Sequence, residues 1–148
     1  MLVTFCGHSR VARGKEVETW LTEVVGDLID EGATHFYLGG YGDFDTLAFK
    51  VVRSFKKAHP NIETTYVKAY LDRDPYNVEW YDGTTYPPIE IGPARFAIVR
   101  RNKWLAETAD VVVAYIRYED FGGAAAMWKH AKRHKKGIIR CPFVYLIQ

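Results

Sequence analysis

Residues 38–45 read Leu-Gly-Gly-Tyr-Gly-Asp-Phe-Asp and lie between a predicted strand and a predicted helix. Glycine has no Cβ, so the backbone of such a turn can come close to a ligand. The first N–H groups of the following helix attract phosphate or carboxylate. This turn is therefore either an ordinary tight connection or one wall of a ligand site.

Strands and helices alternate along the chain on both sides of this turn. The apolar spacing of three and four residues predicts a helix over Lys15–Glu31 and another over Phe44–Phe55. Further helices are predicted over Ala94–Thr108 and Gly123–Lys135. The predicted strands are Leu2–Phe5, His35–Leu38, Glu63–Leu71, Val111–Ile116 and 138–140, with Phe143–Ile147 as a candidate continuation.

This alternation predicts right-handed βαβ units. The expected fold class is α/β, a Rossmann-like doubly wound, mainly parallel five-stranded sheet with helices on both faces. A chain of 148 residues has the length of one domain, so residues 1–148 are expected to form a single domain.

The composition excludes several partner classes. Twenty Lys and Arg against 18 Asp and Glu give a net charge of +2, so no global field indicates nucleic acid. The basic run 129–136 ends a predicted helix and is interpreted as a solvated face. Two distant cysteines suit a reducing compartment, and no segment reaches the roughly 18 apolar residues of a membrane span. We expect a cytoplasmic protein with neither a membrane nor a nucleic-acid partner.

Unusual residues follow each of the first four predicted strands. In a doubly wound sheet, ligands bind outside the carboxyl ends of the strands, near the point where strand order reverses. The four turns are Cys6–Arg10, residues 38–45, Asp72–Pro93 and Arg117–Gly123. Their shared edge predicts one cleft for a small-molecule ligand.

The short turns offer specific recognition groups. Arg10 has donors for a phosphate or carboxylate, while His8 is either a ligand donor or a capping residue. Asp43 and Asp45 can accept from ribose hydroxyls or cap the helix that they begin. The helix start at Gly122 and Gly123 can receive an anion or allow close packing on the sheet.

The Asp72–Pro93 connection is long for a compact domain. Its aromatic residues suit stacking on a base, a packed flap or a dimer contact, and they are Tyr76, Trp80, Tyr81 and Tyr86. Arg95 begins the next predicted helix and faces the same edge. Arg101 and Asn102 lie further along it, either as a ligand clamp or as partners for buried backbone.

Several named motifs are absent from the sequence. It contains neither G-x-x-x-x-G-K-[ST] nor G-x-S-x-G, and the 38–45 turn has two of the three glycines of G-x-G-x-x-G. His130 and His134 lack the intervening glutamate of H-E-x-x-H, and the cysteines have no metal-binding spacing. The sequence therefore predicts no metal and no cofactor.

The combined motifs resemble the SLOG superfamily, and more narrowly its small YpsA-type members. The resemblance rests on Phe5-Cys6-Gly7-His8, on Gly39, Gly40, Gly42, Phe44 and Asp45, on Arg95–Ile98 with Arg101 and Asn102, and on Gly122-Gly123-Ala124. This superfamily includes the "lonely guy" phosphoribohydrolases, DNA-processing protein A and domains thought to sense nucleotides in bacterial and phage conflict. It implies a Rossmann-like fold. It also implies a nucleotide-like ligand over Gly7, His8, Gly39, Gly40, Gly42, Asp45, Gly122 and Gly123.

The chain also departs from this pattern. The phosphoribohydrolase loop reads P-G-G-x-G-T-x-x-E, whereas Leu38, Asp43 and Thr46 replace its proline, threonine and catalytic glutamate. The narrower group reads Gly-His-Arg after the first strand, whereas Ser9 intervenes here before Arg10.

Two hypotheses follow from the resemblance and its departures. The preferred one is binding of a nucleotide or an NAD- or ADP-ribose-derived ligand, with Asp45 on the ribose. The alternative is a nucleotide N-glycosidase or phosphoribohydrolase using Asp45 or Glu79. A homo-oligomer is also expected, and a third possibility is an accessory protein that acts through oligomer contacts.

Overall fold

The computed structural model describes residues 1–75, 77–90 and 92–143. They form one six-stranded sheet in the order β4-β3-β2-β1-β5-β6, with every ladder parallel. The strands are β1 Leu2–Gly7, β2 His35–Leu38, β3 Glu63–Val67, β4 Gly83–Thr85, β5 Val111–Tyr115 and β6 Gly137–Arg140. The helices are α1 Gly14–Asp30, α2 Gly42–Ser54, α3 Ala97–Thr108 and α4 Gly123–Arg133, with short 3-10 turns η1 Val78–Trp80 and η2 Ala94–Phe96.

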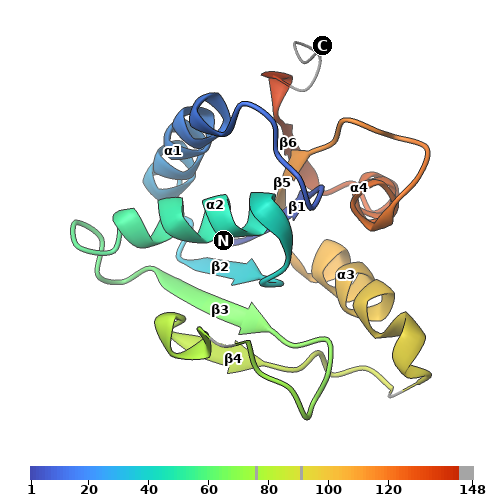
Figure 1. Cartoon of the computed structure of the whole chain (residues 1–148). Coiled ribbons are helices and arrows are strands. Elements are labelled where there is room, and N and C mark those ends of the chain that lie inside the picture. Colours follow the sequence, from blue (N-terminus) through green and yellow to red (C-terminus); the bar gives the residue numbers. More distant parts are fainter. Residues whose placement is uncertain (76, 91, 144–148) are drawn as a thin grey trace.

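The helices cover both faces of the sheet (Figure 1). Helices α1 and α2 pack on one face, and α3 and α4 pack on the other. The apolar stripe of α1, including Val17, Leu21 and Val25, is buried against the first face. A second core lies beneath α3 and α4 and includes Leu105, Met127 and Trp128. The predicted doubly wound α/β class is confirmed.

The sheet has six strands rather than the expected five. The additional strand, β4, lies within the long connection and pairs Thr65 with Gly83 and Val67 with Thr85. Its three residues are too few to show a period of two, so only pairing with β3 reveals it. Strand β3 also ends at Val67 rather than Leu71.

Two sequence-based expectations fall partly or wholly outside the described residues. Tyr76 is one of them, and residues 144–147 of the candidate last strand are the other. Phe143, where that strand was expected to begin, lies in a 3-10 turn.

The strand order reverses beside β1, which pairs with β2 on one side and with β5 on the other. The register sets Cys6 opposite Ala114 and Gly7 opposite Tyr115, so the carboxyl ends of β1 and β5 are level. The turns that follow these two strands therefore meet at the switch point of the sheet.

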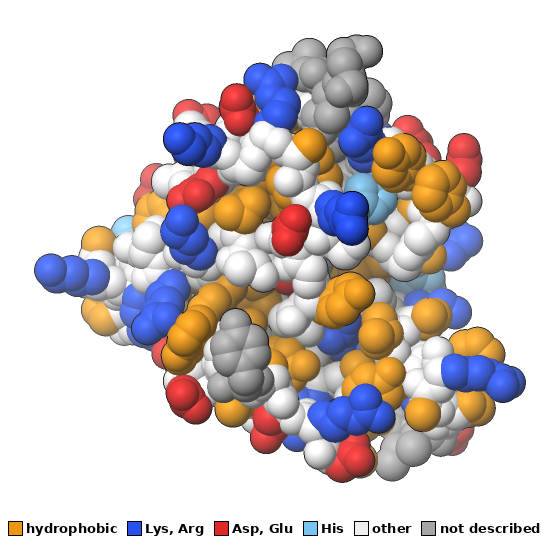
Figure 2. All heavy atoms as spheres, viewed as in Figure 1, with side chains coloured by type: hydrophobic (Ala, Val, Ile, Leu, Met, Phe, Trp, Pro, Cys, Tyr) orange, Lys and Arg blue, Asp and Glu red, His pale blue; other side chains and the backbone are white. Residues whose placement is uncertain are grey.

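The surface carries no single-sign area on the face that Figure 2 shows. Lys and Arg side chains lie interspersed with Asp and Glu, with hydrophobic side chains between them. None of the helices in the described residues has the length and apolar character needed to cross a membrane.

Candidate functional site

A cleft of about 570 Å³ lies at the carboxyl ends of β1, β2 and β5. The turns after these strands form its walls, and α3 closes it from the other side. Its lining residues are Phe5, Cys6, Gly7, His8, Ser9, Arg10, Tyr41, Asp45, Ile98, Arg101, Asn102, Arg117, Tyr118, Gly122, Gly123, Ala124 and Met127. Three of the four predicted turns therefore contribute to one cleft.

His8 links the β1 turn to the β5 turn. Its Nε2 accepts hydrogen bonds from the backbone N–H groups of Arg117 at 2.8 Å and Tyr118 at 3.1 Å. Burial, and then the charge of Arg117, lower the pKa of His8. Since two N–H groups point at Nε2, the network assigns the ring proton to Nδ1. His8 is thus a neutral ring that fixes one wall of the cleft.

Arg101 is buried, with 6% of its surface exposed, although α3 is an otherwise ordinary amphipathic helix. Its Nη1 donates to the carbonyl oxygens of Gly39 at 2.9 Å and Val67 at 3.4 Å. Its Nε and Nη2 donate to Asn102 Oδ1 at 3.3 and 3.2 Å. Of the two interpretations left open by the sequence, these contacts favour a partner for buried backbone, because Arg101 holds the ends of β2 and β3.

Asp45 folds back onto the glycine turn that precedes it. Its Oδ2 accepts from the backbone N–H groups of Gly39 at 3.2 Å and Tyr41 at 3.4 Å. Burial raises the pKa of Asp45 to about 6, although the charge of Arg101 and these backbone hydrogen bonds oppose the shift. Asp45 is therefore a carboxyl group that can change protonation near neutral pH at the cleft.

The N-terminus of α4 opens onto the same cleft. Its N-cap is Gly122, which has no side chain to accept from the first N–H groups of the helix. Gly122 has φ +95°, a conformation that favours glycine. Among the described residues, an added Cβ at Gly122 or Gly123 would meet no atom within 4 Å beyond the chain neighbours and the backbone of α4. The backbone donors at this end are accessible to an anion.

Cys6, near the end of β1, is hydrogen-bonded to the first turn of α4. Its Sγ donates to the carbonyl oxygen of Ala124 at 3.0 Å. Burial, and then the charge of Asp45, raise the pKa of the Cys6 thiol well above its usual range. The neutral thiol is therefore a structural hydrogen-bond donor rather than a nucleophile.

The glycines of the 38–42 turn are required by the protein's own packing. A Cβ on Gly39 would lie 2.8 Å from Arg101 Cζ, and one on Gly42 would lie 2.8 Å from Ser9 Cα. A Cβ on Gly40 would overlap the Tyr66 ring, and Gly40 also has φ +69°. Their abundance is explained without a ligand, so it is not independent evidence for a ligand site.

Six predicted residues lie outside the cleft lining, namely Gly39, Gly40, Gly42, Asp43, Glu79 and Arg95. Asp43 braces the β1 turn, since its Oδ2 accepts from Val11 N at 3.1 Å and its N–H donates to Ser9 O at 2.8 Å. Arg95 is exposed, with its guanidinium 4.8 Å from the Phe96 ring centre. Glu79 is also exposed, in η1.

Of the long connection, Pro75, Asn77, Trp80 and Tyr81 line a second hollow together with α2. This hollow of about 610 Å³ is lined by Gly40, Thr46, Phe49, Lys50, Arg53, Ser54, Pro75, Asn77, Trp80 and Tyr81. Tyr81 packs on Phe49 with ring centres 4.4 Å apart, and β4 extends the sheet behind it. For the described residues of this segment, the packed-flap interpretation fits these contacts, and none of these described residues lines the predicted cleft.

Other aromatic and cationic residues line the cleft. Tyr41 is 68% exposed and Tyr118 is 45% exposed, so both rings are available at its mouth. Arg117 also lines the cleft, with its guanidinium 5.3 Å from the Tyr118 ring centre. These three residues could have been proposed from the sequence, because each lies inside a turn already selected from the sequence.

Comparison with known proteins shows the fold alone. No family model matches the chain, and no curated protein matches it. A solved structure described as the X-ray structure of TM1055, a structural genomics target, is similar with a TM-score of 0.61 and 17% identity. The match covers 93% of this chain and 71% of that chain. This likeness supports the Rossmann-like architecture.

Proposed function

We propose that the chain is a SLOG-like domain that binds a nucleotide or an NAD- or ADP-ribose-derived ligand in the cleft at the carboxyl ends of β1, β2 and β5. The observation that carries the proposal is the bare N-terminus of α4 beside the Arg10 and Arg117 side chains in one cleft. Helix N-terminal N–H groups and guanidinium forks are the usual ligands of phosphate.

The other lining residues suit the rest of a nucleotide. The exposed rings of Tyr41 and Tyr118 offer flat surfaces for a base. Asp45 is the carboxylate available to accept from a ribose hydroxyl. The Nδ1–H that the hydrogen-bond network assigns to His8 is a further donor for an anion. The cleft volume of about 570 Å³ lies within the range of ordinary small-molecule sites.

Two variants of one glycine test the anion site without disturbing the fold. Gly123→Asp places a negative charge at the N-terminus of α4, where it stabilises the helix but repels an anion. Gly123→Ala adds only a methyl group, which among the described residues meets no atom within 4 Å beyond its chain neighbours and the backbone of its own helix. Gly40→Val would not test the anion site in this way, because its side chain would overlap the Tyr66 ring and disturb the fold.

The experiment is calorimetric titration of AMP, ADP, ADP-ribose and NAD into the purified chain and both variants. We expect at least one of these nucleotides to bind the original chain and Gly123→Ala. Gly123→Asp should bind it at least about tenfold more weakly, because a charge-assisted hydrogen bond contributes about 1.5–3 kcal/mol. No binding of any nucleotide, or equal binding to Gly123→Asp, would contradict the proposal.

Hydrolysis of an N-glycosidic bond is the second candidate, and the raised pKa of Asp45 is the observation that favours it. A carboxyl group with a pKa of about 6 can exchange a proton near neutral pH. Thr46, which replaces the family's glutamate, instead donates to Gly42 O at 2.9 Å and lines the second hollow. The carboxylate that lines the cleft is that of Asp45, one position before the residue that aligns with the catalytic glutamate.

Mass analysis of each nucleotide after incubation separates the two candidates. Intact nucleotide recovered with the protein supports binding alone. Released free base that disappears in Asp45→Asn supports hydrolysis through Asp45. Self-association, which is also expected of this chain, is tested in the same samples by size-exclusion chromatography with light scattering.

A further inference from the structure

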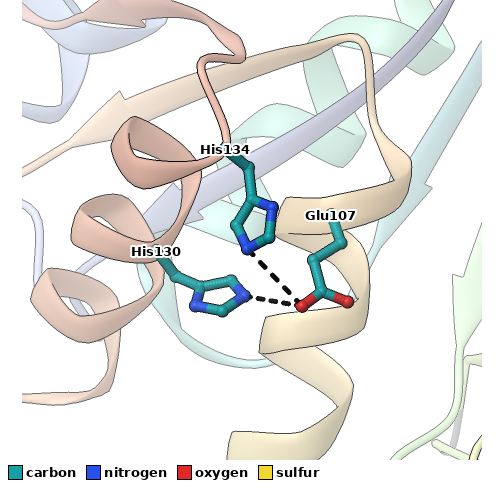
Figure 3. Close-up of side chains that lie close together, drawn as sticks. All are labelled: Glu107, His130 and His134. Carbon is teal, nitrogen blue, oxygen red and sulfur yellow. Dashed lines mark hydrogen bonds and ion pairs between the residues drawn. The ribbon is translucent and has the colours of Figure 1, made fainter.

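Three metal-ligating side chains meet on the outer surface of the α3–α4 pair. Glu107 lies near the end of α3, His130 lies on α4, and His134 directly follows α4. Figure 3 shows the three side chains pointing toward one another. His130 Nε2 lies 2.8 Å from Glu107 Oε1, and His134 Nε2 lies 3.7 Å from the same oxygen.

The spacing of these atoms is close to that of a metal site. In a tetrahedral zinc site, bonds of about 2.0–2.2 Å set neighbouring ligand atoms about 3.3–3.6 Å apart. One ligand atom from each of Glu107, His130 and His134 can be chosen so that all three lie within 4.8 Å of one another. The two separations from Glu107 lie on either side of the ideal value, so small side-chain rotations bring the atoms into position.

Helix geometry holds the two imidazoles on one side. The His134 N–H donates to the His130 carbonyl oxygen at 3.1 Å, which preserves the helical spacing of four residues. Their ring centres are 4.5 Å apart. Glu107 comes from a different helix and supplies a carboxylate oxygen as the third candidate ligand.

We propose that Glu107, His130 and His134 form a surface site for a divalent transition-metal ion, with Zn²⁺ as the best-fitting ion. Two imidazole nitrogens and one carboxylate oxygen form a donor set that zinc accepts, with a fourth position left for water. Glu107 is 48% exposed and His134 is 43% exposed, so an ion can reach the site from solvent. This inference departs from the expectation of no metal and does not depend on the proposed nucleotide site.

The proposed ion would link the two helices far from the cleft. Helix α4 begins at the cleft, whereas this cluster lies at its opposite end, before β6. In the metal-free chain the His130–Glu107 contact already joins α3 to α4. Metal ligation through His130 Nε2 requires that any proton there leave or move to Nδ1. The Arg133 guanidinium, now 3.5 Å from Nδ1, must then turn toward solvent.

The test uses Zn²⁺ and Co²⁺ with the full chain. Calorimetry should show one Zn²⁺ per chain, and Co²⁺ should give the visible absorption of a low-coordinate site. Zn²⁺ about 100-fold above its Kd should raise the Tm by about 5–10 °C, since it binds only the folded chain. His130→Ala, His134→Ala and Glu107→Gln should each weaken Zn²⁺ binding at least about tenfold.

A matched control comes from the His35–Glu63 pair, a surface histidine and carboxylate 3.5 Å apart on neighbouring strands. His35→Ala should leave Zn²⁺ affinity and the Tm shift unchanged. Circular dichroism without metal verifies that each variant is folded. Cys6 and Cys141 are buried, so they do not compete for the ion in the native chain. Absence of Zn²⁺ binding, or equal binding after His130→Ala and His134→Ala, would overturn the site.

Discussion

Two hollows of similar volume share the first turn of α2 but differ in how their walls are built. Asp45 lines the cleft, while its neighbour Thr46 lines the second hollow. The cleft is bounded by strand-end turns that carry backbone donors and arginines. The second hollow is bounded by one face of α2 and by Pro75, Asn77, Trp80 and Tyr81, which we call the aromatic flap. The volumes alone therefore do not distinguish the two hollows, whereas the donors that converge at the switch point of the sheet belong to the cleft and are what our proposal rests on.

One arginine from each of the two regions shows the same difference. Arg101 is buried behind the cleft and donates to two backbone carbonyls of different strands. Arg53 is exposed at the second hollow, with its guanidinium 5.7 Å from the Trp80 ring centre. Arg101 therefore holds backbone segments together in the interior, whereas Arg53 makes its contact with Trp80 at the surface. Variants of each region can test this difference.

The largest effect is expected from Arg101→Ala. It leaves Asp45 without its compensating charge and removes the donor to Gly39 O and Val67 O, so unfolding free energy at pH 7 should fall by about 3–5 kcal/mol. Urea denaturation measures it. Arg53→Ala is the control and should cost no more than about 1 kcal/mol. Equal losses would remove the contrast between the regions.

The next effect concerns pH and Asp45. Its pKa in the folded chain, about 6, exceeds the ordinary value of 3.8 because the carboxyl is buried. Protonation therefore favours the folded state. This contribution is complete below about pH 3.8 and is lost as pH rises through about 6, amounting to up to about 3 kcal/mol by pH 7. Asp45→Asn should remove this dependence in denaturation curves measured from pH 4 to 7.

Asp82, which lies next to Tyr81 of the flap, is a control because its pKa is shifted in the opposite direction to that of Asp45. Burial alone would raise its pKa, but the Thr64 N–H and Lys56 outweigh burial and hold the pKa below its ordinary value. Its stabilising contribution is therefore present above that ordinary value and lost as pH falls. If Asp45→Asn and Asp82→Asn changed the pH profile in the same direction, the assignment of a raised pKa to Asp45 would be wrong.

A smaller effect is expected from His8→Ala. The N–H groups of Arg117 and Tyr118 lose their acceptor but can turn to water, so unfolding free energy should fall by about 1 kcal/mol. Nucleotide affinity should fall about tenfold with the loss of a donor to the anion. Calorimetry measures the affinity, and His8→Gln, which can place Oε1 near the Nε2 position, should restore most of the stability. An unchanged affinity would remove His8 from the ligand site.

The smallest effect is expected from Trp80→Ala in the second hollow. The ring is 48% exposed, and its cation–π contact with Arg53 contributes about 0.5–1 kcal/mol at an exposed position. Nucleotide affinity should not change, since Trp80 does not line the cleft. Loss of affinity in this calorimetric control would show that the aromatic flap serves the ligand after all.

Much of the fold could be predicted because its signals are local. The apolar spacing of α1 and α2 and the apolar run at β5 establish the alternation of helix and strand within short windows of sequence. The turns after β1, β2 and β5 were recognisable from Gly7, Gly39 and Gly122 with their polar neighbours. Strand β4 was missed because three residues carry no period, and its pairing with β3 joins residues well apart in the sequence.

The sequence by itself determined the alternation of elements and the edge of the sheet at which the polar turns meet. The tertiary structure decided what each residue does there. It turned Arg101 toward two backbone carbonyls, Asp45 toward the cleft and Thr46 away from it, and it brought Glu107 beside His130 and His134. Periodicity and turn chemistry act between near neighbours in sequence. Contacts between separate elements depend on how helices pack across a twisted sheet, which no single segment encodes.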